Sequence, residues 1–275
     1  MPDFVHKPVM PAEVLAALAP RPGGRYVDGT IGGGGHAALI LAASAPDGRL
    51  LGCDRDGAAL EASRMRLAAA FPGRFELRLG NYADLAEWLP PASCDGVLLD
   101  LGVSSPQLDE PERGFSFQAE GPLDMRMDRR QTMTAAHVVN EWAEADLARI
   151  FWELGGEPQS RRIARAMVER RRAGRIETTA QLAALIERVV PRRGNKRHPA
   201  TRVFQALRMT VNDELRSLER GLAAACSILK PGGRLAVITF HSGEDRLVKA
   251  FGRERARDYT FPGEVDIPEL RVPRQ

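Results

Sequence analysis

Three aspartates stand at the ends of short apolar runs, a placement that favours a binding site for an organic ligand that carries positive charge. They are Asp28, Asp54 and Asp100. If the runs are parallel strands of one sheet, their carboxyl ends meet at the same crevice, where open α/β sheets bind ligands. The Asp100 carboxylate would then face the same crevice as the other two.

A glycine-rich segment, residues 28–36, reads Asp-Gly-Thr-Ile-Gly-Gly-Gly-Gly-His and leads from a predicted strand into a predicted helix. Glycines let the backbone approach a ligand closely, and a helix N-terminus adds unpaired N–H groups. Asp54 follows about 20 residues later, where a carboxylate can bind a ribose diol. The pattern indicates a nucleotide-type cofactor, although a tight turn alone also uses glycines.

Two cofactors fit this segment, NAD and S-adenosylmethionine (SAM). Gly32-x-Gly34-x-x-Ala37 could match the alanine variant of the dinucleotide fingerprint. The Asp28 carboxylate, however, would repel a pyrophosphate and would suit a sulfonium and an ammonium group. The charge argument therefore favours SAM. Tyr82 follows the third predicted strand, where its ring could lie against an adenine or pack on the sheet edge.

The order of elements predicts an α/β fold with a parallel sheet. Predicted strands cover residues 25–31, 49–54, 75–80, 95–101 and 234–240, and predicted helices cover 37–43, 58–70 and 201–229. Between residues 109 and 201 only helical patterns occur, at 134–139, 145–154, 158–174 and 182–190, with Thr178 and Gln181 as a capping box. We predict a Rossmann-like sheet domain, residues 1–108 and 202–275, interrupted by an all-α insertion, residues 109–201.

Charge is unevenly distributed along the chain. The net charge is +3, yet residues 158–216 contain 15 Lys and Arg against 5 Asp and Glu. Such a segment suggests a polyanionic partner, the alternative being a solvated helix face. The apolar runs are too short to span a bilayer, and the N-terminus lacks a secretion signal. Three scattered cysteines disfavour disulfides and a zinc cluster, so we expect a cytoplasmic protein without membrane contact or metal.

A second polar strand end, residues 239–246, reads Thr-Phe-His-Ser-Gly-Glu-Asp-Arg. His241 could act as a base, donate a hydrogen bond to substrate or bridge to Asp245, and the structural bridge is favoured. A polar stripe on the helix that follows the insertion could border the crevice or face solvent: Thr201, Gln205, Arg208, Asn212 and Arg216.

These segments together resemble the ribosomal RNA small subunit methyltransferase H family over nearly the whole chain. The matching stretches are residues 6–10, 28–36, 54–56, 100–108, 113–117, 122–128, 204–208 with Asn212, and 240–249. The resemblance implies SAM-dependent methylation of the exocyclic N4 of a cytidine in 16S rRNA of the small ribosomal subunit. It also implies an RNA-recognising helical insertion.

By motif, the resemblance implies SAM contacts at Gly34, Gly35, His36, Asp54, Tyr82, Asp100 and Gln107. The family usually has Phe in place of Tyr82 and Leu in place of Gly243. The glycine predicts a more mobile loop after His241. The oligomeric state stays open.

Cytosine N4 is a weak nucleophile because its lone pair is delocalised into the ring. We predict Asp100 as the catalytic acceptor for the N4 hydrogens, with Phe115 or Phe117 either stacking on the base or packing in the core. Three alternatives remain: a non-catalytic RNA-binding module, a cytosine-C5 RNA methyltransferase, which needs a cysteine nucleophile, and an NAD oxidoreductase.

Overall fold

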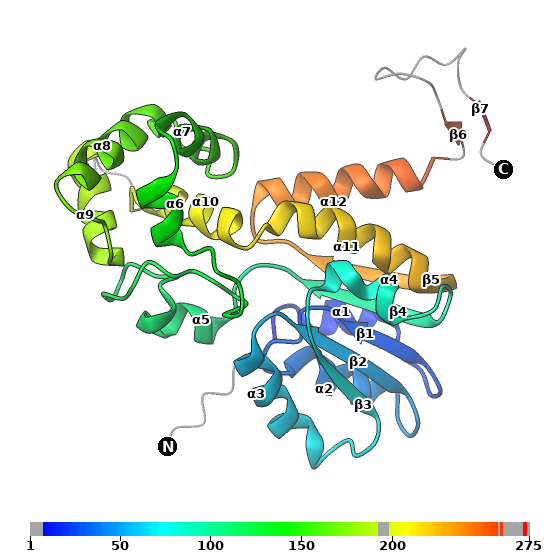
Figure 1. The fold of residues 1–275 in the computed structure, drawn as a ribbon. Coiled ribbons are helices and arrows are strands. Elements are labelled where there is room, and N and C mark those ends of the chain that lie inside the picture. Colours follow the sequence, from blue (N-terminus) through cyan, green and yellow to red (C-terminus); the bar gives the residue numbers. More distant parts are fainter. Residues whose placement is uncertain (1–7, 192–197, 258, 261–271, 274–275) are drawn as a thin grey trace.

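A five-stranded parallel sheet forms the centre of the fold in the computed structural model, which describes residues 8–191 and 198–257 together with 259–260 and 272–273 (Figure 1). The strands lie in the order β3-β2-β1-β4-β5. Their bounds are β1 Arg25–Asp28, β2 Arg49–Asp54, β3 Phe75–Leu79, β4 Cys94–Asp100 and β5 Leu229–Ile238. The predicted Rossmann-like α/β sheet is thus confirmed. A separate antiparallel pair joins β6 Tyr259–Thr260 to β7 Val272–Pro273.

Helices cover both faces of the sheet because neighbouring strand residues point to opposite sides. Tyr26 and Leu50 join one apolar core, and Val27 and Cys53 join the other. The first core is closed by α1 Pro11–Leu18, α2 Gly35–Ala43 and α3 Gly57–Ala68. The second is closed by the short helices η1 Tyr82–Asp84 and α4 Leu85–Trp88, and by α11 Glu214–Ile228 and α12 Ser242–Arg255.

The middle of the chain forms a helical part with its own apolar core, drawn in green to yellow in Figure 1. Its largest fully buried side chains include Phe151, Met125 and Ile163. The elements are α5 Ser105–Asp109, η2 Pro111–Arg113, α6 Ala135–Glu141, α7 Glu144–Glu153, α8 Ser160–Arg172, α9 Thr179–Val189 and α10 Thr201–Val211. The buried residues of α10 belong to this cluster, so α10 packs with the helical part although the predicted insertion ends at residue 201.

Two of the predicted helix starts are built as expected from the sequence. The Thr134 hydroxyl accepts a bond from the His137 N–H at 3.2 Å, and the Thr178 hydroxyl accepts one from the Gln181 N–H at 3.2 Å. The Gln181 side chain reaches back one residue further than a capping box requires, to the Glu177 N–H at 2.9 Å. Each cap satisfies backbone donors that the first helical turn leaves unpaired.

The predicted single helix 201–229 is wrong, because the chain breaks at Asn212 and Asp213 between α10 and α11. The Asn212 side chain accepts a bond from the Met127 N–H and donates one to the Met125 carbonyl, both at 2.8 Å. Asp213 has a φ of 47°, in the left-handed region. Bonds to a distant loop thus override the helical pattern of the local sequence.

The last strand of the sheet begins earlier than the sequence predicts. β5 starts at Leu229 and includes residues 230–233, which the sequence predicts as a turn. At this turn the pairing of β5 with β4 shifts register, between Cys94 and Gly96 of β4. Gly232 has a φ of 78° there. β5 ends beside Asp100, which pairs with Ile238, so residues 239–241 follow at the carboxyl edge of the sheet. None of the helices in the described residues is long and apolar enough to cross a bilayer.

Candidate active site

A cavity of about 440 Å³ opens at the carboxyl ends of β1, β2, β4 and β5. Six of the seven residues predicted to contact the cofactor line it: Gly35, His36, Asp54, Tyr82, Asp100 and Gln107. The seventh, Gly34, is the N-cap of α2 and lies between two lining residues, Gly33 and Gly35, without lining the cavity itself. The volume falls in the range of small-molecule sites.

The turn after β1 needs glycine at two positions. Gly32 and Gly34 have φ values of 51° and 75°, which L side chains rarely adopt. A side chain at Gly34 would also press on Ser63, whose hydroxyl donates to the Gly32 carbonyl at 2.6 Å. Gly35 then begins α2, and both Gly35 and His36 line the cavity. The unpaired N–H groups of this first helical turn therefore lie beside the cavity, where they suit an anionic group. This fits the carboxylate of an amino acid cofactor.

Asp54, at the end of β2, is held by two backbone donors. Its Oδ2 accepts from the Gly32 N–H at 3.0 Å and its Oδ1 accepts from the Asp56 N–H at 2.9 Å. Burial raises the pKa of Asp54 to about 6. Each oxygen retains a further lone pair, which suits the two hydroxyls of a ribose.

Asp28 corrects the charge argument made from the sequence. Its side chain is 1% exposed, does not line the cavity, and accepts one long bond, from the Thr30 N–H at 3.3 Å. Burial raises its pKa to about 8, so the carboxyl is mainly protonated at neutral pH and carries little of the charge assigned to it. The acidic residues that line the cavity are instead Asp54, Asp100, Glu214 and Glu244, of which Glu214 is paired with Arg208.

Asp100 lines the cavity at the end of β4, as predicted. Its backbone N–H donates to the Thr30 hydroxyl at 2.7 Å, and its Oδ2 lies 3.7 Å from His36 Nε2. Its Oδ1 is buried, and no donor in the described part of the chain bonds to it. Burial, and then the charge of Glu244, raise the pKa of Asp100 to about 6. A buried acceptor of this kind fits a ligand that brings its own N–H or cationic group.

Gln107 reaches the cavity as part of a buried polar network. Its Oε1 accepts from the Ser104 N–H at 3.1 Å, and its Nε2 donates to Asp56 Oδ2 at 2.9 Å. The same Asp56 oxygen accepts from Arg113 at 2.6 Å, and the Asp56 Oδ1 caps α3 through the Ala58 N–H. Asp56 and Arg113, which hold the Gln107 side chain in place, could not be found from the sequence, because nothing local marks either residue as buried.

Tyr82 lies between two glycines rather than on the sheet edge. The ring packs against Gly221 of α11, and its Cβ approaches Gly29, so a side chain at either glycine would collide with it. Burial raises the pKa of Tyr82, which keeps the phenol neutral. Contact between Tyr82 and an adenine stays a prediction.

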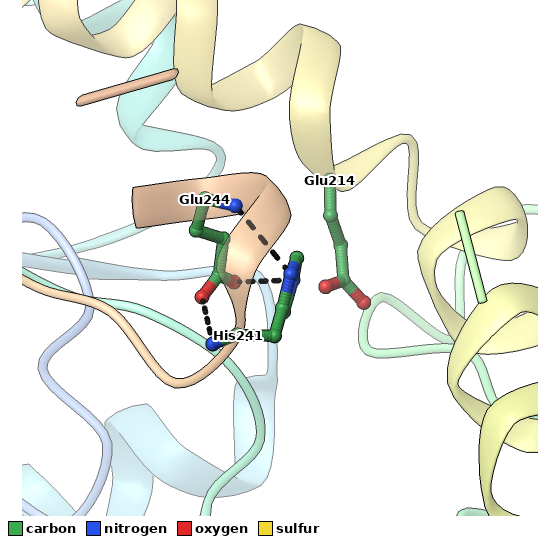
Figure 2. A group of neighbouring side chains, drawn as sticks. All are labelled: Glu214, His241 and Glu244. Carbon is green, nitrogen blue, oxygen red and sulfur yellow. Dashed lines mark hydrogen bonds and ion pairs between the residues drawn. The ribbon is translucent and has the colours of Figure 1, made fainter. Parts of the chain in front are cut away.

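The segment after β5 is a helix cap, shown in Figure 2. His241 Nδ1 accepts from the N–H groups of Gly243 and Glu244, and Glu244 Oε2 accepts from the Phe240 N–H at 2.9 Å. His241 Nε2 lies 3.1 Å from Glu244 Oε1, so its carboxylate partner is Glu244 and not Asp245. The mobile loop expected at Gly243 is therefore the first turn of α12. Burial raises the pKa of Glu244, but the bonds from His241 and Phe240 outweigh it and lower that pKa overall.

Glu214 lies on the other side of the His241 ring (Figure 2), and ligand atoms of Glu214, His241 and Glu244 lie within 4.8 Å of one another. Both Glu214 oxygens, however, accept from Arg208, at 2.8 and 2.7 Å. The guanidinium already supplies the positive charge that these oxygens require, so we assign no metal to this group.

Several other predicted residues lie away from the cavity. Phe115 packs in the helical core and Phe117 stacks edge-on against Phe204, and neither lines the cavity. Of the polar stripe, Arg208 lines the cavity and Asn212 fills the helix break. Phe240 is a second aromatic residue of the cavity lining, beside Tyr82; it is 58% exposed and is not among the predicted contacts. Its only sequence signal was its place in a polar strand end.

A basic surface lies on the helical part. On α8, the exposed arginines Arg161, Arg162 and Arg172 lie outside the apolar core of the helix. Arg165 pairs with Glu169 at 3.1 Å, which neutralises one charge of this face. The centre of the predicted basic loop, residues 192–197, lies outside the described residues.

The sheet order and the carboxylate-lined cavity at the strand ends are those of a Rossmann-like fold, a class of proteins that binds nucleotide-type ligands at this edge of the sheet. The MraW methylase family model matches residues 3–274, and the chain belongs to this family. A ribosomal RNA small subunit methyltransferase H from Geobacter sulfurreducens is 54% identical over 280 residues, which cover 98% of this chain and 90% of the relative. The protein of the same name from Syntrophotalea carbinolica is 56% identical, covering 96% of this chain and 85% of its own.

A solved putative methyltransferase from Streptococcus mutans, in complex with SAH, aligns over 34% of this chain and 53% of its own, with 16% identity and a TM-score of 0.31. The family match, and not this partial overlap, carries the assignment. The chain is a methyltransferase, and its cofactor is SAM, as predicted. Membership of this family excludes two of the alternatives, an NAD oxidoreductase and a non-catalytic RNA-binding module.

Proposed function

We propose that this methyltransferase modifies the exocyclic N4 of a cytidine in 16S rRNA of the small ribosomal subunit. Support comes from the relatives' names, from the resemblance of the site motifs and from one feature of the site. That feature is Asp100, a carboxylate at a strand end inside the cavity, with one buried oxygen that lacks a donor. Such a substrate would place the protein in the cytoplasm.

The donor side of the cavity matches the chemistry of SAM. We assign the ribose diol to Asp54, and the amino acid end to the glycine turn at Gly34, Gly35 and His36. Tyr82, Asp100 and Gln107 complete the predicted contacts. When bound, SAM supplies a sulfonium methyl group, and its sulfur keeps the electron pair of the bond that breaks. The raised pKa values of Asp54 and Asp100 fit this donor, because a nearby cation stabilises both carboxylates.

Asp100 acts on the acceptor. Its carboxylate accepts a hydrogen bond from the cytosine amino group, orients the nitrogen and stabilises the positive charge that develops there. Once the N–C bond has formed, the carboxylate takes the proton that N4 loses. A pKa of about 6 leaves Asp100 mainly ionised at neutral pH and still basic enough to accept that proton.

The basic face of α8 is our candidate for RNA backbone contact. Exposed arginines at Arg161, Arg162 and Arg172 would neutralise phosphates and release counterions. A cytosine-C5 reaction is less well supported, since it needs a thiol at the acceptor. Cys53 and Cys94 are buried, and among the described residues that line the cavity there is no cysteine.

Incubation of unmethylated small subunits with the protein and SAM tests the proposal, followed by mass analysis of 16S nucleosides. We expect one N4-methylated cytidine, and a rate at least 100-fold lower for Asp100→Asn at saturating SAM. Asp95→Asn is the matched control, because Asp95 lies at the other end of β4 beside Lys230. Methylation at C5, no methylation, or full activity of Asp100→Asn would each contradict the proposal.

A further inference from the structure

An aromatic ring at the cavity is left unexplained by the cofactor contacts. Phe240 is 58% exposed, whereas the large apolar residues of the neighbouring strand, Leu98 and Leu99, are completely buried. Burying a Phe side chain contributes roughly 1.5–3 kcal/mol, so an exposed ring forgoes stability. Phe240 lines the cavity that Asp100 also lines.

The sheet register brings Phe240 close to the reacting carboxylate. β4 and β5 are adjacent and parallel, and Asp100 pairs with Ile238, two residues before Phe240. Adjacent strands lie about 4.8 Å apart. The Phe240 ring also approaches Gly102, where a Cβ would lie 3.4 Å from its Cδ2 atom. The ring therefore lies along the wall of the cavity beyond Asp100.

The backbone that carries this ring is fixed although the ring is exposed. The Phe240 N–H donates to Glu244 Oε2 at 2.9 Å, and the same oxygen lies 3.4 Å from the backbone nitrogen of His241. In return, His241 Nδ1 accepts from the first turn of α12, as Figure 2 shows. Glu244 is 2% exposed. A preorganised, exposed ring loses little entropy when a flat ligand stacks on it.

From this geometry we propose that Phe240 is the stacking platform for the target cytosine, a role that rests on the proposed function. A base that leaves its helix loses its stacked neighbours, and an aromatic side chain replaces them. With the base on Phe240, its exocyclic amine can reach Asp100 from the adjacent strand end. Arg208 and Glu244 add polar groups to the same cavity for the edge of the base.

The test compares Phe240→Leu, which keeps an apolar side chain, with Phe240→Tyr, which keeps an aromatic face. Single-turnover methylation is measured on saturating small subunits, and SAM affinity is measured by calorimetry. We expect Phe240→Leu to lower the single-turnover rate about 10- to 100-fold with SAM affinity unchanged, and Phe240→Tyr to keep most of the rate. Met65→Leu, at an exposed apolar residue on α3, serves as the control.

Wild-type activity of Phe240→Leu overturns the inference. Loss of SAM affinity in Phe240→Leu also overturns it, because the ring would then belong to the cofactor pocket. An equal loss of rate in Phe240→Tyr excludes stacking. These results are distinct from failure of the proposed function, in which the wild-type protein itself forms no N4-methylcytidine.

Discussion

Replacing Asp28 by Asn should stabilise the protein in the absence of cofactor. The carboxyl lies under the glycine turn, 1% exposed, with its pKa raised by burial from 3.8 to about 8. In the unfolded chain the same group ionises near pH 4. Between these values the folded protein must take up a proton or bury a charge, so the contribution of Asp28 to stability is fully present below about pH 4 and is lost as the pH rises towards 8.

The size of the effect follows from the two pKa values. At pH 7 about three pH units lie above the unfolded pKa, which corresponds to roughly 4 kcal/mol at 1.36 kcal/mol per unit. Asparagine avoids this cost but pays about 2 kcal/mol to bury its amide. We therefore expect a net gain of about 2 kcal/mol for Asp28→Asn, or a rise in Tm of roughly 4–8 °C.

Thermal unfolding of both proteins at pH 5, 6, 7 and 8 measures the difference. The gain should grow with pH and vanish near pH 5. Saturating SAM should reduce the difference in Tm between the two proteins. A nearby cation lowers the pKa of Asp28 and so reduces the free energy lost by burying this carboxyl. Asp146→Asn, at an exposed residue of α7, should change the Tm little at any pH. A pH-independent gain, or a loss at pH 8, would refute the assignment of a buried, protonated Asp28.

Three further outcomes are expected. Arg113→Ala leaves the buried Asp56 carboxylate without its cation and should lower the free energy of unfolding in urea by about 3–5 kcal/mol, and SAM affinity should fall as well. An unchanged midpoint of urea unfolding would exclude a structural role for the Arg113–Asp56 pair. The methylation rate should fall below about pH 6, as Asp100 becomes protonated and can no longer accept a proton, and a flat profile from pH 5 to 8 would contradict this. Arg161→Ala with Arg162→Ala should weaken small-subunit binding and reduce the slope of log K against log salt by about 2, with SAM affinity as the control.

The sheet and its site could be predicted because they depend on local patterns. Apolar runs separated by glycine-rich turns identify strands, and aspartates at their ends mark the crevice, which is where Asp54 and Asp100 lie. The helix starts at Thr134 and Thr178 were equally visible, since a cap involves residues within one turn. The domain boundaries and the individual cofactor contacts stay predictions.

What the sequence could not reveal depends on contacts between distant residues. The break at Asn212 is made by bonds to residues 125 and 127, more than 80 positions away. Burial of Asp28 depends on the sheet and turn around it, and a carboxylate at a strand end gives no sign of its depth. A phenylalanine directly after an apolar strand is expected in the core, and only the folded structure shows that Phe240, two residues after the end of β5, is exposed.

The interruption between α10 and α11 is one of the places where the helical part is bonded to the sheet part. Asn212 bonds to the 125–127 loop of the helical part through its side chain, while its carbonyl accepts from Arg55, the neighbour of Asp54. A shift of the helical part would therefore strain a bond that ends one residue from Asp54, the carboxylate that we propose to bind the ribose. The Arg113–Asp56 pair links the same two parts beside Gln107, so the helical part and the donor side of the cavity are connected at these two places.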